Sequence, residues 1–164
     1  MMLIRTATAE DIPVIIALAE DTWLPTYVPI IGEVQVRYML DRFYNPGALL
    51  AQMKEGQHFL LLLEHEAPVG FASYSKNDGD AYKLNKLYVQ PYLQGKGYGK
   101  ALLGAVISEA KALGAGELIL NVNRYNTAKA FYEREGFVVL REENIDIGAG
   151  YFMNDFVMGV KFIT

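Results

Sequence analysis

The chain has 164 residues, of which 52% are hydrophobic and 21% are charged. This length predicts one compact domain over residues 1–164, and the composition excludes a disordered or collagen-like chain. Lys and Arg number 15 against 19 Asp and Glu, so the formal net charge is -4 and we expect no nucleic-acid partner.

The chain contains no cysteine, which excludes disulfides, thiolate metal sites and cysteine nucleophiles. This composition suits a reducing cytoplasm, where we expect the protein to be located. No basic start precedes an apolar run at the N-terminus, and the longest strongly apolar stretch, Phe59 to Leu63, is too short to span a bilayer. We therefore expect a soluble, unprocessed protein without a membrane partner.

The N-terminal part of the chain is predicted to hold one short strand, Met2 to Thr6, followed by helices. Thr8 and Asp11 form an approximate capping box for a first helix that runs to Asp21. The apolar residues expected on its buried face are Ile12, Ile15, Ile16 and Ala19.

A turn-rich segment, Pro25 to Gly32, is predicted to separate this helix from a second one. The apolar stripe of the second helix consists of Val36, Met39, Leu40 and Phe43. A third helix is expected to start at Pro46, because proline is favoured in the first turn of a helix.

From Gln57 onward the apolar pattern changes to that of strands. The predicted strands are His58 to Glu64, Val69 to Ser75, Ala81 to Val89, Glu117 to Val122, Phe137 to Leu140 and Tyr151 to Phe162. Two helices are expected among them, one running from a glycine-rich loop to about Leu113 and one over Thr127 to Glu135.

The glycine-rich loop, Gln94 to Lys100, lies between a predicted strand and a long helix. Unpaired backbone N–H groups converge at such a helix start and bind anions, although a glycine turn without a ligand has the same pattern. The glycine spacing, with Ala101 after Lys100, does not fit a Walker loop. A dinucleotide fingerprint fails too, because its third glycine position falls on Lys100.

The loop resembles the acyl-CoA pyrophosphate loop of the GNAT acetyltransferase superfamily, whose pattern Gln94, Gly97 and Gly99 satisfy. The flanking Leu87-Tyr88-Val89 and Ala101-Leu102-Leu103 match the strand and helix on either side of that motif. A second block, Asn126 to Phe137, is similar to the next helix of the family and its Gly-Phe entry into a strand. The stretch from Trp23 to Gly56 matches only as helical filler of variable sequence.

The resemblance implies an α/β (α+β type) single GNAT-fold domain, with a mixed, mostly antiparallel, splayed central sheet flanked by helices. It implies acetyl-CoA as cosubstrate and no metal. The pantetheine arm would add to the strand at Leu87 to Val89 through backbone bonds, and the loop would cradle the pyrophosphate. The implied cofactor-binding residues are Leu87, Tyr88, Val89, Gln94, Gly95, Lys96, Gly97, Tyr98, Gly99, Lys100, Asn126 and Lys129.

Each of these assignments has an alternative. Leu87 and Val89 also suit a plain core strand, and Lys96 and Lys100 also suit solvated positions. Asn126 matches a position that reaches the cofactor, and it equally suits the cap of the helix after it.

The resemblance also assigns Tyr132 as the acid that protonates the CoA sulfur, while packing on its helix is the alternative. The base stays open, because Lys83 to Lys86 stand where many relatives have a glutamate. Asn85 acting through water, Asp146, Asp155 or another acidic residue are the options. His58 and His65 are expected to face opposite ways and to bind no metal.

The function implied is direct acetyl transfer, without a covalent enzyme intermediate, to a primary amine of a polyamine-like or amino-acid-like small molecule. A protein N-terminus or lysine is the alternative acceptor, and a non-catalytic acyl-CoA-binding module is the alternative class. The dense apolar set on the last strands, from Tyr151 to Phe162, predicts a homodimer.

Overall fold

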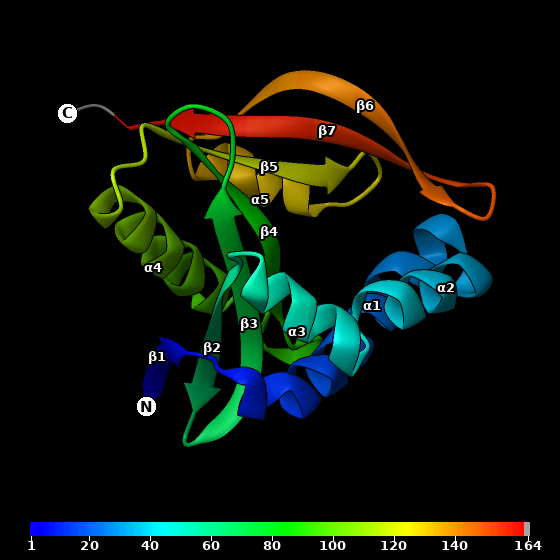
Figure 1. The fold of residues 1–164 in the computed structure, drawn as a ribbon, viewed down its shortest axis with the longest axis horizontal. Helices are drawn as coiled ribbons and strands as arrows, with labels where there is room; N and C mark the ends of the chain where they lie inside the picture. The colour runs from blue at the N-terminus through cyan, green and yellow to red at the C-terminus, as the bar shows by residue number, and fades with distance from the viewer. Residues whose placement is uncertain (163–164) are drawn as a thin grey trace.

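The computed structural model describes residues 1–162, which form a seven-stranded sheet in the order β1-β2-β3-β4-β5-β7-β6 (Figure 1). Its strands are β1 (Met2–Thr6), β2 (His58–Glu64), β3 (Ala67–Lys76), β4 (Ala81–Val89), β5 (Glu117–Asn123), β6 (Val138–Gly148) and β7 (Tyr151–Lys161). Neighbouring strands are antiparallel except for β4 and β5, which are parallel. The mixed, mostly antiparallel sheet is therefore confirmed.

Helices cover both faces of this sheet. They are α1 (Ile12–Ile31), α2 (Glu33–Phe43), α3 (Pro46–Lys54), α4 (Tyr98–Ala112) and α5 (Ala128–Arg134), with short 3-10 turns at Ala9–Asp11 and Pro91–Leu93. Side chains alternate along β2: Phe59 and Leu61 pack with α1 to α3, whereas Leu60 and Leu62 pack on the face of α4 and α5. Burial on both faces explains the unbroken apolar run of this strand.

The helix α1 differs from the prediction. It does not end at Asp21 but continues to Ile31, with Pro25 and Pro29 inside it, so the predicted turn-rich segment is wrong. Proline removes one helical hydrogen bond, and burial of Trp23 and Tyr27 in the core beneath α1 to α3 stabilises the helix despite that loss. Gly32, with φ of 84°, ends it.

This N-terminal helical segment is a longer apolar stretch than Phe59 to Leu63. Over Ala9–Ile31 it is the one helix of residues 1–162 that is long and apolar enough to cross a membrane by length and composition. A core helix passes the same test, and α1 packs on β3 and β4. We interpret it as a core helix.

Smaller differences concern the turns and the C-terminal hairpin. His65 lies in the turn between β2 and β3 with φ of 50°, so strand parity does not apply to it, and the expectation that His58 and His65 face opposite ways has no basis. Strand β6 runs on to Gly148 rather than ending at Leu140, because it pairs with nearly all of β7.

The feature that positions the site lies in the middle of the sheet. Strands β4 and β5 pair only over Ala81–Leu84 and Glu117–Leu120. Beyond these four residue pairs the strands diverge, and β4 stays bonded to β3 as far as Val89. The sheet is therefore splayed, and a gap opens at the carboxyl ends of the two parallel strands.

Two glycine substitutions test how tightly β4 is held. A Cβ at Gly70 in β3 would lie 2.8 Å from the backbone oxygen of Tyr88, whereas a Cβ at Gly104 in α4 would meet nothing within 4 Å. We expect Gly70→Ala to lower the free energy of unfolding by about 1–3 kcal/mol. Gly104→Ala should raise it by about 0.5–1 kcal/mol, because alanine is the better helix former. Urea denaturation measures both, and equal values for the two variants would contradict the close contact at β4.

Candidate active site

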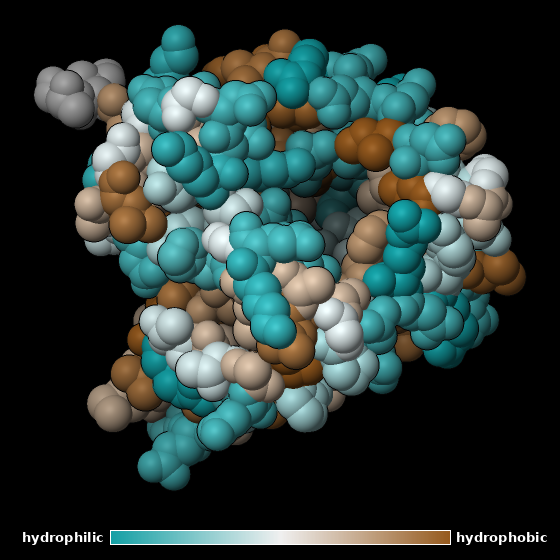
Figure 2. Space-filling view, in the orientation of Figure 1, coloured by the Kyte–Doolittle hydropathy of each residue, from teal (hydrophilic) through white to brown (hydrophobic). Residues whose placement is uncertain are grey.

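A cleft of about 1020 Å³ opens where β4 and β5 diverge. The surface is hollowed near the centre of the view in Figure 2, between α1 to α3 and the C-terminal strands. Its walls come from α1, β4, the glycine-rich loop, the start of α4, β5, and the segment from Tyr125 to Glu135 that contains α5. Most of the residues singled out from the sequence lie on it: Leu87, Tyr88, Val89, Gln94, Gly95, Gly97, Gly99, Lys100, Asn126 and Tyr132.

The glycine-rich loop forms one end of this cleft. Gly95 and Gly97 have φ of 81° and 86°, a conformation that residues with a Cβ rarely adopt, and Gly97 caps α4. Among the described residues, no backbone carbonyl accepts from the N–H groups of Gly95, Gly97 or Gly99. The loop thus presents free donors at a helix N-terminus, which favours an anionic ligand.

Three of the predicted cofactor residues do not line the cleft. Lys96 is exposed at the tip of the loop. The hydroxyl of Tyr98 donates to Glu64 Oε2 at 2.7 Å, which directs this side chain toward the end of β2. The Nζ atom of Lys129 pairs with Glu133 at 3.6 Å and lies 5.0 Å from the ring centroid of Phe156.

Strand β4 presents its last residues along the cleft. The ring of Tyr88 packs against those of Trp23 and Phe71, with centroids 5.9 and 5.5 Å away. Burial among these rings raises the pKa of Tyr88 well above its usual range. These aromatic contacts therefore hold Tyr88 in place on the cleft wall. At this residue the backbone of β4 has no partner on the β5 side.

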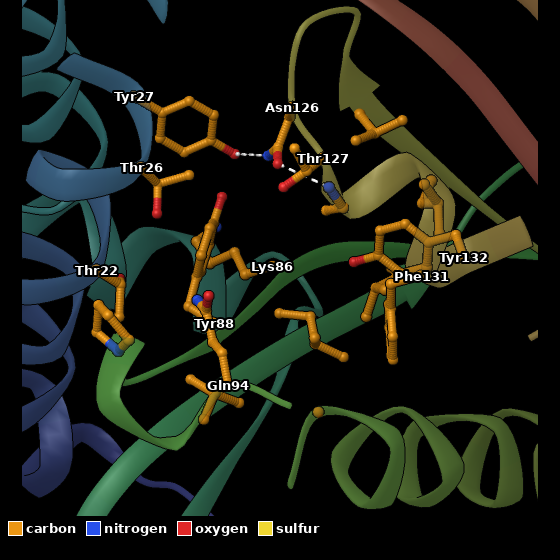
Figure 3. Close-up of a pocket in the computed structure, with 18 of the residues that line it drawn as sticks. Thr22, Thr26, Tyr27, Lys86, Tyr88, Gln94, Asn126, Thr127, Phe131 and Tyr132 are labelled. Carbon is orange, nitrogen blue, oxygen red and sulfur yellow. Dashed lines mark hydrogen bonds between the residues drawn. The ribbon is translucent and has the colours of Figure 1, made fainter. Parts of the chain in front are cut away.

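Tyr132 extends from α5 into the cleft, where Figure 3 shows its hydroxyl pointing inward. The residue is 7% exposed, and its ring packs edge-on against Phe131 and Phe137, with centroids 5.1 and 5.6 Å away. Burial raises the pKa of Tyr132, so its hydroxyl stays protonated in the neutral range. Among residues 1–162 no side chain forms a hydrogen bond with this hydroxyl, which leaves its proton free for a ligand.

A hydrogen bond crosses the cleft at Asn126. Its Nδ2 donates to the hydroxyl of Tyr27 in α1 at 3.4 Å, while its Oδ1 accepts from the N–H of Ala128 at 2.9 Å (Figure 3). Asn126 therefore closes the turn just before α5, whose N-cap position is Thr127, and it also links the two walls. The sequence offered Asn126 either as a residue that reaches the cofactor or as the cap of this helix, and the cap position is taken by Thr127 instead. The contact with Tyr27 has no local sequence signal.

Lys86 is a site residue that the sequence reasoning missed. It lines the cleft from β4, is half-buried, and its Nζ donates to Gln57 Oε1 at 3.3 Å. The rings of Tyr44 and Phe59 lie 5.6 and 5.5 Å from Nζ. Burial, and to a lesser degree Lys83, lowers the pKa of Lys86 to about 8. The available sequence signal was a lysine close to Leu84 and Leu87 in a predicted strand.

The groups considered for removing the proton of the amine differ in whether they line the cleft. Asn85 lines the cleft, and its Nδ2 donates to Ser75 Oγ at 2.9 Å. Asp155 is buried, which raises its pKa, and it accepts from Asn121 at 3.4 Å without lining the cleft itself. Asp146 is exposed in β6, where it accepts from the N–H of Gly148 at 2.8 Å. The acidic residue on the cleft wall is Glu135, at the end of α5.

No group of three His, Asp or Glu residues within 1–162 is placed to bind a metal ion. The cleft instead combines free backbone donors, an exposed strand edge and a buried, protonated phenol. In this fold two parallel strands diverge, and a glycine turn leads from the first of them into a helix. These features define the acyl-CoA-dependent acyltransferase fold of the GNAT type. The sequence model of the acetyltransferase (GNAT) domain matches residues 27–152, and the chain belongs to this family.

Known proteins similar to this chain are N-acetyltransferases. It is 28% identical over 165 residues to the spermidine N(1)-acetyltransferase of Thermoplasma acidophilum, covering 97% of this chain and 96% of that protein. It is 33% identical over 106 residues to the ribosomal protein bS18-alanine N-acetyltransferase of Haemophilus influenzae, covering 65% and 68%. The crystal structure of the PaiA N-acetyltransferase of Thermoplasma acidophilum in complex with coenzyme A aligns with a TM-score of 0.84 and 27% identity over 99% of each chain. The protein is therefore a GNAT-type N-acetyltransferase.

Proposed function

We propose that the protein transfers the acetyl group of acetyl-CoA directly to a primary amine of a small molecule. The observation that carries this proposal is the protonated hydroxyl of Tyr132, which faces a cleft that begins at a loop of free backbone N–H groups. The similarity to a spermidine acetyltransferase and to a structure with coenzyme A bound supports both the donor and a small acceptor.

The residues of the cleft fit the cofactor. The free N–H groups of Gly95, Gly97 and Gly99 suit a pyrophosphate, and Lys100 on the same wall adds positive charge. The diverging edge of β4, at Leu87 to Val89, offers backbone groups to an extended amide-bearing arm. When bound, acetyl-CoA supplies an acyl group activated as a thioester.

The residues of the cleft can also donate and accept the protons that move during the reaction. The amine nitrogen forms a bond to the acyl carbon as the carbon–sulfur bond breaks, and Tyr132 donates its proton to the departing sulfur. The proton that leaves the amine nitrogen returns to Tyr132, so the transfer itself is proton-neutral. An acceptor that arrives as an ammonium first releases one proton, and we assign this step to water held at Asn85, which lines the cleft where Asp146 and Asp155 do not.

Two alternatives remain as outcomes of the tests below. Transfer to a protein N-terminus has support from the similarity to the ribosomal protein acetyltransferase. The bond between Asn126 and Tyr27 narrows the cleft between α1 and α5, which favours a small acceptor. A non-catalytic acyl-CoA-binding module would retain the loop and would not depend on Tyr132.

We also propose that the protein is cytoplasmic and forms a homodimer through the C-terminal hairpin. Strand β6 is the edge of the sheet, and Val138, Val139 and Leu140 on it are exposed, as is Phe152 on β7. An unpaired apolar edge is stabilised by a second copy of the same edge. Phe156, by contrast, is partly buried against the core and beneath Lys129.

The loop assignment is tested by placing a carboxylate at its centre. We expect Gly97→Asp to weaken acetyl-CoA binding about tenfold or more, a loss of about 1.4 kcal/mol, because the new charge repels the pyrophosphate. Gly114→Asp is the matched control, since Gly114 also has a positive φ, of 93°, and lies at the opposite end of α4. Isothermal titration calorimetry measures both variants, and unchanged affinity in Gly97→Asp would remove the loop from the site.

The role of Tyr132 is tested by removing its hydroxyl alone. Tyr132→Phe should lower kcat about 100-fold, with little change in acetyl-CoA affinity, because the hydroxyl acts as the sulfur departs. Tyr92→Phe, at a position 68% exposed and outside the cleft, should leave kcat unchanged. Release of the CoA thiol over a panel of amines gives the rates. Wild-type turnover by Tyr132→Phe would mean that Tyr132 only packs against its neighbours.

The dimer is tested by sedimentation at micromolar concentration. We expect a dimer for the wild type and a monomer for Phe152→Glu, with the circular dichroism spectrum retained, because a buried carboxylate opposes association. Tyr92→Glu adds the same charge at an exposed position away from β6 and should leave the dimer intact. A wild-type protein that sediments as a monomer at every concentration would refute the assembly.

A further inference from the structure

The two ends of the cleft differ in charge. Its charged lining residues are Lys86, Lys100, Arg134 and Glu135. Lys100 stands in the first turn of α4, and Arg134 and Glu135 end α5, whose Phe131 lies 3.8 Å from the position of a Cβ at Gly99. These three residues therefore belong to the loop end. At the opposite end, between α1 and β4, the charged lining residue is Lys86.

Within the part of the chain that the structure describes, the ammonium of Lys86 has no counter-ion. None of the ion pairs formed within residues 1–162 includes it. Its hydrogen-bond partner, Gln57 Oε1, is a neutral amide oxygen that also accepts from Ser73 Oγ at 2.9 Å. A partly buried cation without an anion is unfavourable, and the lowered pKa of Lys86 has the same cause. An anion supplied by a ligand offsets that cost.

The rest of this end is uncharged. Thr22, Thr26 and Tyr27 face it from α1 (Figure 3), and Tyr88 stands beside Lys86 on β4. The hydroxyl of Thr22 donates to Leu18 O at 2.9 Å and is engaged within the helix. A polyamine carries several positive charges. At this end of the cleft Lys86 would repel them, and no carboxylate on the wall would attract them.

We propose that the acceptor is an amine that also carries a carboxylate, of the amino-acid class, and that Lys86 binds this carboxylate. The inference rests on the proposed function, because it concerns the acceptor of the same reaction. It assigns Lys86 as a specificity-determining residue and distinguishes this cleft from one that takes spermidine. A lysine that only packs its aliphatic stem on Phe59 would not make the enzyme distinguish an acid from its amide.

The test uses matched acceptors and matched variants. The acceptors are L-amino acids, each compared with its α-amide, together with spermidine. The variants are Lys86→Met, which keeps an unbranched side chain, and Lys76→Met, which removes the same charge from an exposed position at the end of β3. Thiol release gives kcat and KM, and calorimetry on the protein with coenzyme A bound gives acceptor affinity without turnover.

For the preferred acid we expect Lys86→Met to raise KM about 10- to 100-fold, the range for a hydrogen bond to a charged group, with kcat little changed. KM for the matching amide should stay the same, and Lys76→Met should behave as the wild type. The wild type should use the acid better than its amide and better than spermidine.

Three results overturn the proposal: no preference for any acid over its amide, spermidine as the best acceptor, or an equal loss for acid and amide in Lys86→Met. If amines are acetylated under any of these results, the proposed function stands and this inference fails. If nothing is acetylated but acids bind in a Lys86-dependent manner, Lys86 binds a carboxylate as proposed, but the bound acid is not an acceptor and the proposed function fails.

Discussion

Strands β4 and β5 share only four residue pairs, and the site depends on where that pairing stops. A parallel pair needs a crossover, and α4 supplies it, so the glycine-rich loop must lie at the carboxyl end of β4. When β5 turns away after Leu120, it leaves the backbone of β4 open from Asn85 onward. The early end of the β4–β5 pairing therefore creates the gap and exposes a strand edge within it. The crossover places a helix N-terminus at the opening of the same gap.

The chemistry of the gap follows from what lines it. Burial on α5 keeps the hydroxyl of Tyr132 protonated, and burial on β4 works in the opposite direction on the ammonium of Lys86. Desolvation disfavours the charged form in both cases, which leaves a neutral proton donor at one wall and an under-stabilised cation at another. The carboxylate on the wall, Glu135, lies at the loop end, which is why we propose that an acceptor releases its proton to water held at Asn85.

Much of this arrangement was predictable because its signals are local. The strand before the loop, the glycines and the helix that follows are encoded by residues adjacent in sequence, and the block around Tyr132 has a similar local pattern. Positions that depend on tertiary contacts were not predictable. Tyr98 belongs to the loop motif, yet its hydroxyl meets Glu64 from β2. In the sequence, Lys86 is one of several lysines in predicted strands. Its contacts with the rings of Tyr44 and Phe59 depend on tertiary packing.

The two prolines in α1 have a consequence for how this cleft can change. Because proline has no amide proton, the carbonyls of Asp21 and Pro25 lack the donor that normally lies four residues further on, at Pro25 and Pro29. Pro25 itself lines the cleft. The cleft wall at Pro25 thus belongs to a stretch of α1 whose main chain has unused hydrogen-bond acceptors, which side-chain substitutions at other positions do not alter. Preferences that depend on this backbone would persist as neighbouring side chains diverge, and would be lost when either proline is replaced.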